Sequence, residues 1–245
     1  IAVLDDYIYQ QMDIAASFTR LVGGDTKTMD AAFEKVKQII ANRKPEDDEP
    51  AELLPFKGAL RRAEARGADR YLGIPENHVH FLNLPFYETG SVKKNPLGQA
   101  DVDIIVKLLR EVKPHQIYAA GDLADPHGTH GVCLDAILRA YDVVCDDEWF
   151  KDCYTWWYRG AWMEKKKKKV DMAVPISPSE LSIKRKSIYK HGSQNNGPAF
   201  PGDDPREFWQ RAEDRNRNTA NIYNKLGMAE YEAMEVFARY IHKKK

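Results

Sequence analysis

The stretch Gln116–Cys133 constrains the fold of this chain more than any other. A short apolar run, 117–120, stops at Gly121, and a helical pattern covers residues 132–144. A buried strand that ends at glycine and leads through a polar loop into a helix is how α/β proteins place their sites, at the carboxyl ends of strands. The loop holds the densest set of metal-ligand and acid–base groups in the chain, namely Asp122, Asp125, His127 and His130.

The segments around this stretch predict an alternation of strands and helices. Alternating apolar residues predict a strand at 78–84, and an amphipathic helix at 101–112 precedes the strand at 116–120. Such an order implies a parallel sheet with right-handed crossovers. We therefore expect an α/β fold, a three-layer sandwich with a mainly parallel, Rossmann-like sheet. Further strands are predicted within 152–162 and 170–177, and further helices at 7–22, 28–40, 53–72, 179–191, 204–226 and 228–242.

An acidic segment bounded by prolines, 45–50, predicts an exposed linker after two amino-terminal helices. We accordingly expect residues 1–52 to form a helical flank or insertion, and residues 53–245 to form the α/β domain. The chain opens with Ile1 rather than Met, so we expect that something precedes it.

Charge and cysteine content bound the class of protein. The 37 basic and 37 acidic residues cancel, and the lysine run 165–169 has no aromatic residues among it, so nucleic acid is not an expected partner. No apolar run approaches the roughly 18 residues that span a bilayer, so we expect no membrane partner. Three cysteines without a Cys-x-x-Cys pair indicate a reducing, cytoplasmic location. The sequence leaves a homo-oligomer open.

The pair His127 and His130 admits two interpretations. Imidazoles three positions apart share one face of a helical turn, and zinc binds imidazole together with carboxylates. Asp125 or Asp122 would then orient an imidazole from behind. The alternative is that these residues only form a turn and a helix cap, because Asp-Pro starts turns readily and Thr129 can cap a helix.

Other candidate residues also have two interpretations. Arg61 lies in the predicted helix 53–72, where it is either part of a charged outer face or reaches into a cleft. The aromatic residues within 154–162 either pack in the core or stack on sugar rings. For both, the pattern by itself favours the purely structural interpretation.

Three motifs, in order along the chain, give a family resemblance. They are Arg61-x-x-Glu64-Ala65 followed by Leu72-Gly73, then Asp125-Pro-His127-Gly-Thr-His130, then Lys184 with His191-Gly-Ser193-Gln194. Over roughly 53–195 the chain resembles the LmbE/PIG-L-type deacetylases, metal enzymes that remove the acetyl group from N-acetylglucosamine derivatives. A closer likeness is to the deacetylase-like half fused to glucosamine-6-phosphate deaminase-type domains in some bacterial proteins.

The resemblance implies a role for each matched residue. His130 matches the metal ligand, and His127, braced by Asp125, matches the residue that stabilises the oxyanion or protonates the leaving amine. Arg61 matches a helix residue near the sugar. The implied activity is zinc-dependent amide hydrolysis of an amino-sugar substrate, with Zn²⁺ or another divalent metal as cofactor.

One motif of that family is absent from this chain. The family's His-Pro-Asp-Asp motif, which supplies further metal ligands and the general base, does not occur here and would lie upstream of Ile1. We therefore expect that the amino-terminal part of the domain is missing. Two other hypotheses stay open: an accessory portion of a glucosamine-6-phosphate deaminase/isomerase, or a catalytically incomplete sugar-binding module.

Overall fold

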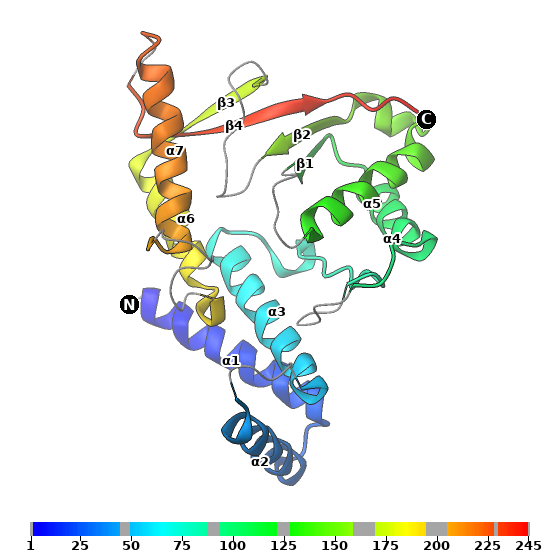
Figure 1. Cartoon of the computed structure of the whole chain (residues 1–245), viewed down its shortest axis with the longest axis vertical. Coiled ribbons are helices and arrows are strands. Elements are labelled where there is room, and N and C mark those ends of the chain that lie inside the picture. The colour runs from blue at the N-terminus through cyan, green and yellow to red at the C-terminus, as the bar shows by residue number, and fades with distance from the viewer. Residues whose placement is uncertain are drawn as a thin grey trace. The chain divides into compact units, whose positions relative to one another are not determined.

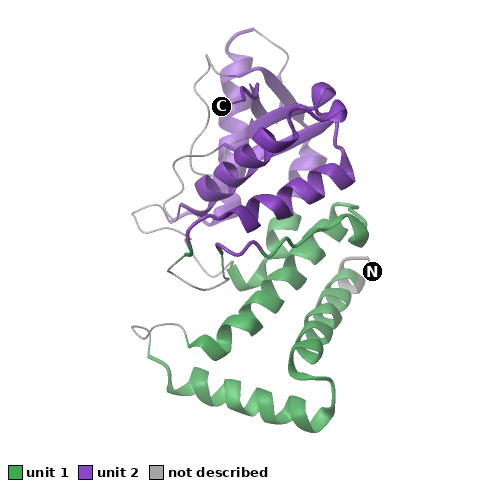
Figure 2. Cartoon of the chain, turned by 90° about the vertical axis from the view of Figure 1, so that its right-hand side faces the viewer, with its two compact units in different colours: residues 1–83, 87–95, 186–196 green, residues 84–86, 96–185, 197–245 purple. Residues whose placement is uncertain are grey.

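The computed structural model describes residues 2–44, 50–87, 94–121, 128–158, 170–194, 205–227 and 230–244. The chain divides into two compact units, coloured green and purple in Figure 2. Unit 1 comprises residues 1–83, 87–95 and 186–196, and unit 2 comprises residues 84–86, 96–185 and 197–245. No described helix is both long enough and apolar enough to cross a membrane. The linker predicted at 45–50 and the lysine run 165–169 lie almost wholly outside the described residues.

Unit 1 is built from helices. Gly67 allows α3 to approach α1 closely, because a Cβ there would lie 3.2 Å from the Gln10 side chain. Arg66 then joins α3 to α1 through two bonds to Asp13, at 3.1 and 3.2 Å. The unit that contains residues 1–52 therefore continues into α3. Its elements are α1 (Ala2–Val22), α2 (Thr26–Asn42), α3 (Leu54–Tyr71), the 3-10 turns η1 (Ala51–Leu53), η2 (Glu76–His78) and η5 (Gly192–Gln194), and the end of α6 (Pro178–Tyr189).

Unit 2 is an α/β unit, so the expected fold class is confirmed. Its sheet has the strand order β1-β2-β4-β3 (Figure 1). Pairing is parallel between β1 and β2, as the crossover through α5 requires, while β4 runs antiparallel to both of its neighbours. Its elements are α4 (Gln99–Val112), β1 (Gln116–Ala120), α5 (Thr129–Val144), η3 (Glu148–Asp152), β2 (Tyr154–Tyr158), β3 (Met172–Ile176), α7 (Phe208–Asn224) and β4 (Ala233–Tyr240), with most of α6.

Helices α5 and α7 pack against the same face of this sheet. Tyr141 of α5 is fully buried and lies 3.0 Å from the hydroxyl of Thr155 on β2. Ala220 of α7 packs with Met234 and Val236 on that same face. Glu235 lies between these two residues and points to the opposite face, because side chains alternate along a strand.

A buried carboxylate sets the start of α4. Asp101 accepts the backbone N–H groups of Gly98 and Phe86, each at 2.9 Å. Satisfying these donors begins the helix whose apolar side buries Val102 and Ile105. The helix and the strand that follows it agree with the periodicity of the sequence.

Two predicted elements are wrong. Residues 78–84 contain no strand, since 76–78 form the turn η2 and the chain continues without regular structure to 84. The segment 228–242 is not a closing helix but contains β4. Its residues carry helix propensity, yet pairing with β2 on one side and β3 on the other satisfies the backbone of 233–240 in a sheet.

Candidate functional site

The strand and the helix predicted on either side of residues 122–127 occur where expected. β1 covers 116–120 and α5 begins at Thr129. Gly121 continues the parallel ladder by donating its N–H to the carbonyl of Tyr158 at 2.8 Å. A Cβ at Gly121 would lie 2.8 Å from the Cβ of Trp157, so only glycine fits here without a shift.

The predicted site residues are only partly covered by the described structure. Asp122, Asp125 and His127 lie outside the described residues, and their roles stay predictions. His130 is the second residue of α5 and is exposed. Arg61 is exposed on α3 in unit 1.

The metal centre also stays a prediction. Among the described residues, no three His, Cys, Asp or Glu side chains gather as ligands for one ion. A catalytic zinc takes about three protein ligands. The described residues therefore do not make up a zinc centre by themselves, and a centre that includes His130 needs ligands from outside them.

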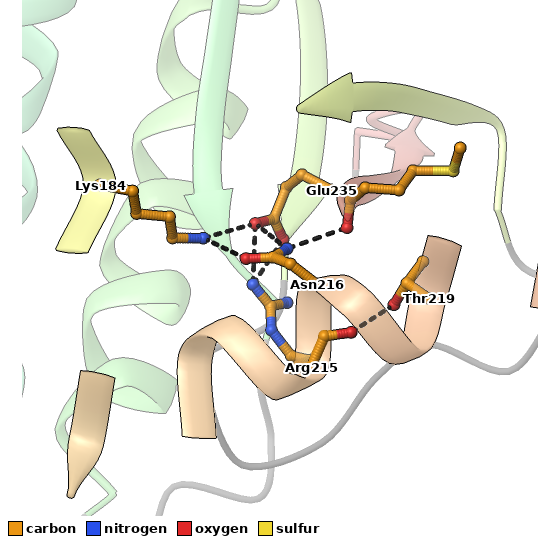
Figure 3. Close-up of polar contacts among 6 residues, drawn as sticks. Lys184, Arg215, Asn216, Thr219 and Glu235 are labelled. Carbon is orange, nitrogen blue, oxygen red and sulfur yellow. Dashed lines mark hydrogen bonds and ion pairs between the residues drawn. The ribbon is translucent and has the colours of Figure 1, made fainter. Parts of the chain in front are cut away.

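The best-defined polar cluster of unit 2 surrounds Glu235 on β4 (Figure 3). Arg215 Nη2 donates to both carboxylate oxygens of Glu235, at 2.7 and 2.8 Å. Lys184 Nζ donates to Glu235 Oε2 at 2.9 Å and to Asn216 Oδ1 at 2.7 Å. The Asn216 amide completes the set, donating to Glu235 at 3.0 Å and to the Met234 carbonyl at 2.9 Å.

The fold places this cluster at the edge of the sheet where active sites of α/β proteins lie. β1 and β2 end together, Ala120 beside Tyr158. β4 runs the other way, so its first residues, including Glu235, lie toward that same edge. Helices α6 and α7 then bring Lys184 and Arg215 to the carboxylate, as Figure 3 shows.

The electrostatics of the cluster favour an ionised Glu235. Burial opposes ionisation of this carboxyl, but the charges of Arg215 and Lys184 and the Asn216 hydrogen bond outweigh it and lower its pKa. Tyr158 behaves in the opposite way, because burial and the charge of Glu235 raise the pKa of its phenol. At neutral pH the edge thus carries a fixed carboxylate and a protonated phenol, which suit it to hydrogen bonding rather than to general acid catalysis by Glu235.

Glu64 is a buried carboxylate of unit 1. Glu64 Oε1 accepts the backbone N–H of Ser193 at 2.7 Å, and Oε2 accepts the Ser193 hydroxyl at 2.6 Å. Only 3% of the Glu64 surface is exposed to solvent. Glu64 and Ser193 belong to the first and last of the three motifs that carry the resemblance, and the fold brings these two motifs into contact.

Sequence reasoning missed Glu235, Arg215 and Asn216. All three lie in segments predicted only as closing helices, and Glu235 falls in the one that proved to be a strand. The sequence carries no signal for this cluster, because a charge that alternates with apolar residues along a strand ordinarily points to the solvent-facing side. Lys184, by contrast, was already part of the third motif.

Comparisons with known proteins give one informative likeness. No protein-family model matches the chain. A protein of Bacteroides thetaiotaomicron (strain VPI-5482), provisionally named a glucosamine-6-phosphate deaminase-like protein, is 49% identical over 244 residues. The match covers 98% of this chain and 37% of that protein. The chain thus spans little more than a third of the length of the curated relative that it matches.

Proposed function

We propose that this chain is an accessory portion of a glucosamine-6-phosphate deaminase-like protein and serves amino-sugar metabolism. The observation that carries the proposal is the 49% identity to the Bacteroides protein across 98% of the chain. Because the match covers 37% of that protein, we assign the chain a supporting role rather than the whole reaction.

The geometry at the sheet edge is in keeping with a supporting role. The charge of Glu235 is matched within the protein by Arg215 and Lys184, so the loss of either cation would destabilise the fold. This pairing is in keeping with a binding or assembly role for this portion.

Turnover of glucosamine-6-phosphate tests the proposal. Deamination converts glucosamine-6-phosphate and water into fructose-6-phosphate and ammonia, and both products are measurable by coupled assays. We expect the full-length Bacteroides relative to form both products and the 245-residue chain to form neither. Turnover by the isolated chain would overturn the accessory role, and inactivity of the full-length relative would overturn the deaminase assignment.

A second candidate function is N-deacetylation of an amino sugar. The observation that favours it is the contact between Glu64 and Ser193, which joins two motifs of the deacetylase resemblance across the chain. Bound zinc or a similar ion would supply Lewis acidity toward the acetyl carbonyl, and His130 would be one of its ligands.

Acetate release tests this second candidate. We expect a protein of the relative's full length to release acetate from an N-acetylglucosamine derivative, and substitution of the histidine equivalent to His130 by alanine to abolish the release. Unchanged release in that variant would exclude His130 from the site. Fructose-6-phosphate formation without acetate release would leave only the deaminase proposal.

A further inference from the structure

Unit 1 contains a cavity whose described lining residues include none of the predicted site residues. The cavity measures about 340 Å³ and is formed by α1, α3 and the segment that runs from the end of α6 into η5. Pockets for small molecules begin at about 300 Å³, so the space suits a ligand the size of a monosaccharide phosphate. All of its lining residues belong to unit 1.

Three tyrosines give this cavity aromatic walls. Tyr7 comes from α1, Tyr71 from the last turn of α3 and Tyr189 from the end of α6. Tyr7 is 57% exposed and Tyr189 is 45% exposed, although both border a cavity. Exposed aromatic faces such as that of Tyr7 can stack against the C–H face of a sugar ring.

Two charged groups of the cavity neutralise each other. Lys190 pairs with Asp6 and lies over the ring of Tyr71, 5.2 Å from its centroid. Burial lowers the pKa of Lys190. The carbonyl of Lys190 also accepts the side-chain amide of Gln10 at 2.7 Å, so this wall is held in place by α1.

Two other charged groups that line the cavity, Glu64 and Lys186, have no ion-pair partner among the described residues. Glu64 is held by the N–H and O–H of Ser193, which are neutral donors, and each carboxylate oxygen has capacity for a further hydrogen bond. Lys186 is exposed at the rim, and the described structure records no ion pair for it. The cavity therefore offers one buried negative charge and one positive charge at its mouth.

We propose that this cavity binds an amino-sugar phosphate, with the ammonium and hydroxyl groups directed to Glu64 and the phosphate to Lys186. A zwitterionic sugar matches both uncompensated charges and the aromatic walls, whereas a ligand of one sign matches only half of them. This inference rests on the proposed function, because amino-sugar phosphates are the substrates that the function implies. The inference adds a binding site for the amino-sugar phosphate, namely this cavity in unit 1.

Calorimetric titration of the 245-residue chain with three ligands tests the cavity. We expect glucosamine-6-phosphate to bind about tenfold more tightly than glucose-6-phosphate, which lacks the ammonium, and than glucosamine, which lacks the phosphate. Equal affinity for the three ligands, or no binding at millimolar concentration, would overturn the proposal.

Substitutions of two exposed side chains, Lys186 and Tyr7, test binding without removing residues of the core. Lys186→Met should weaken the binding of both phosphates several-fold without affecting glucosamine, and Lys107→Met on α4 is its control. Tyr7→Ala should weaken all three ligands, and Tyr9→Ala, two residues along α1 and outside the cavity, is its control. Affinities unchanged in both Lys186→Met and Tyr7→Ala would place any binding elsewhere.

The binding assay and the turnover assay fail independently. Binding by this chain with no deamination by the full-length relative would retain the cavity and overturn the deaminase assignment. Deamination by the relative without binding to this chain would overturn the cavity and retain the proposed function.

Discussion

Glu64 in unit 1 is buried and Glu235 in unit 2 is half-buried, and the two carboxylates are satisfied by different partners. Glu235 meets a guanidinium and an ammonium, from Arg215 and Lys184. Glu64 meets the neutral N–H and O–H groups of Ser193. The charge of Glu235 is matched by cations within the fold, whereas Glu64 lines a cavity and has only neutral donors, so a ligand can supply the matching charge.

The largest expected effect comes from removing the guanidinium beside Glu235. Arg215→Met leaves a half-buried carboxylate with only Lys184 as a cation, so the loss should approach that of a fully buried pair, about 3–5 kcal/mol. Urea unfolding measures this loss in the free energy of unfolding. Arg139→Met, which removes an exposed pair with Asp135, is the matched control and should cost less than about 0.5 kcal/mol. Equal losses in the two variants would contradict a structural role for Glu235.

Two glycines, Gly121 at the edge of the sheet and Gly192 next to Glu64, sharpen the comparison. Gly121→Ala forces a methyl group to 2.8 Å from Trp157 at the sheet edge, and such overpacking costs about 1–3 kcal/mol. Gly192→Ala places its methyl group 3.8 Å from Glu64 Oε1, an ordinary contact. We expect thermal unfolding to show a clear loss for the first variant and almost none for the second. A larger loss for Gly192→Ala than for Gly121→Ala would show that atoms pack more closely around Gly192 than around Gly121.

Removing the serine hydroxyl tests the neutral donors of Glu64. Ser193→Ala takes away one of the two bonds to a buried carboxylate and should cost about 1–2 kcal/mol of unfolding free energy. Ser193→Thr keeps a hydroxyl and should restore most of that loss in the same denaturant titration. If both variants unfold like the unmodified chain, the serine does not hold Glu64.

Acid should weaken the Glu235 cluster, and this effect is the smallest of the four. The pKa of Glu235 is lowered in the folded protein from its ordinary value of 4.5. At a pH near these values, the Glu235 carboxyl group therefore binds fewer protons in the folded than in the unfolded protein. Its stabilising contribution is complete above that value and is lost as the pH falls through the lower, folded pKa. Unfolding free energies of the chain and of Glu235→Gln, measured from pH 7 to 3, should therefore converge in acid. A constant difference would contradict the assigned charge.

Local periodicity correctly predicted the helices and the strand around Gln116–Cys133. The strand at 116–120 and the helices at 101–112 and 132–144 occur within a few residues of their predicted bounds, because their apolar spacing matches one regular structure. The segment 228–242 was assigned to a helix because its residues have helix propensity. Its strand forms only through neighbours on both sides, and those lie far away in the chain.

The sequence by itself determined the α/β class, the position of the β1–loop–α5 segment and the residue types that carry the family resemblance. Tertiary structure decided which charges meet. Lys184 reaches Glu235 across 51 residues, and Ser193 reaches Glu64 across 129. Periodicity reports only which residues of one element share a face, since it arises from local backbone geometry. The partner of a charged side chain depends on the path of the whole chain. That path gives Glu235 two cationic partners and Glu64 only the neutral donors of Ser193.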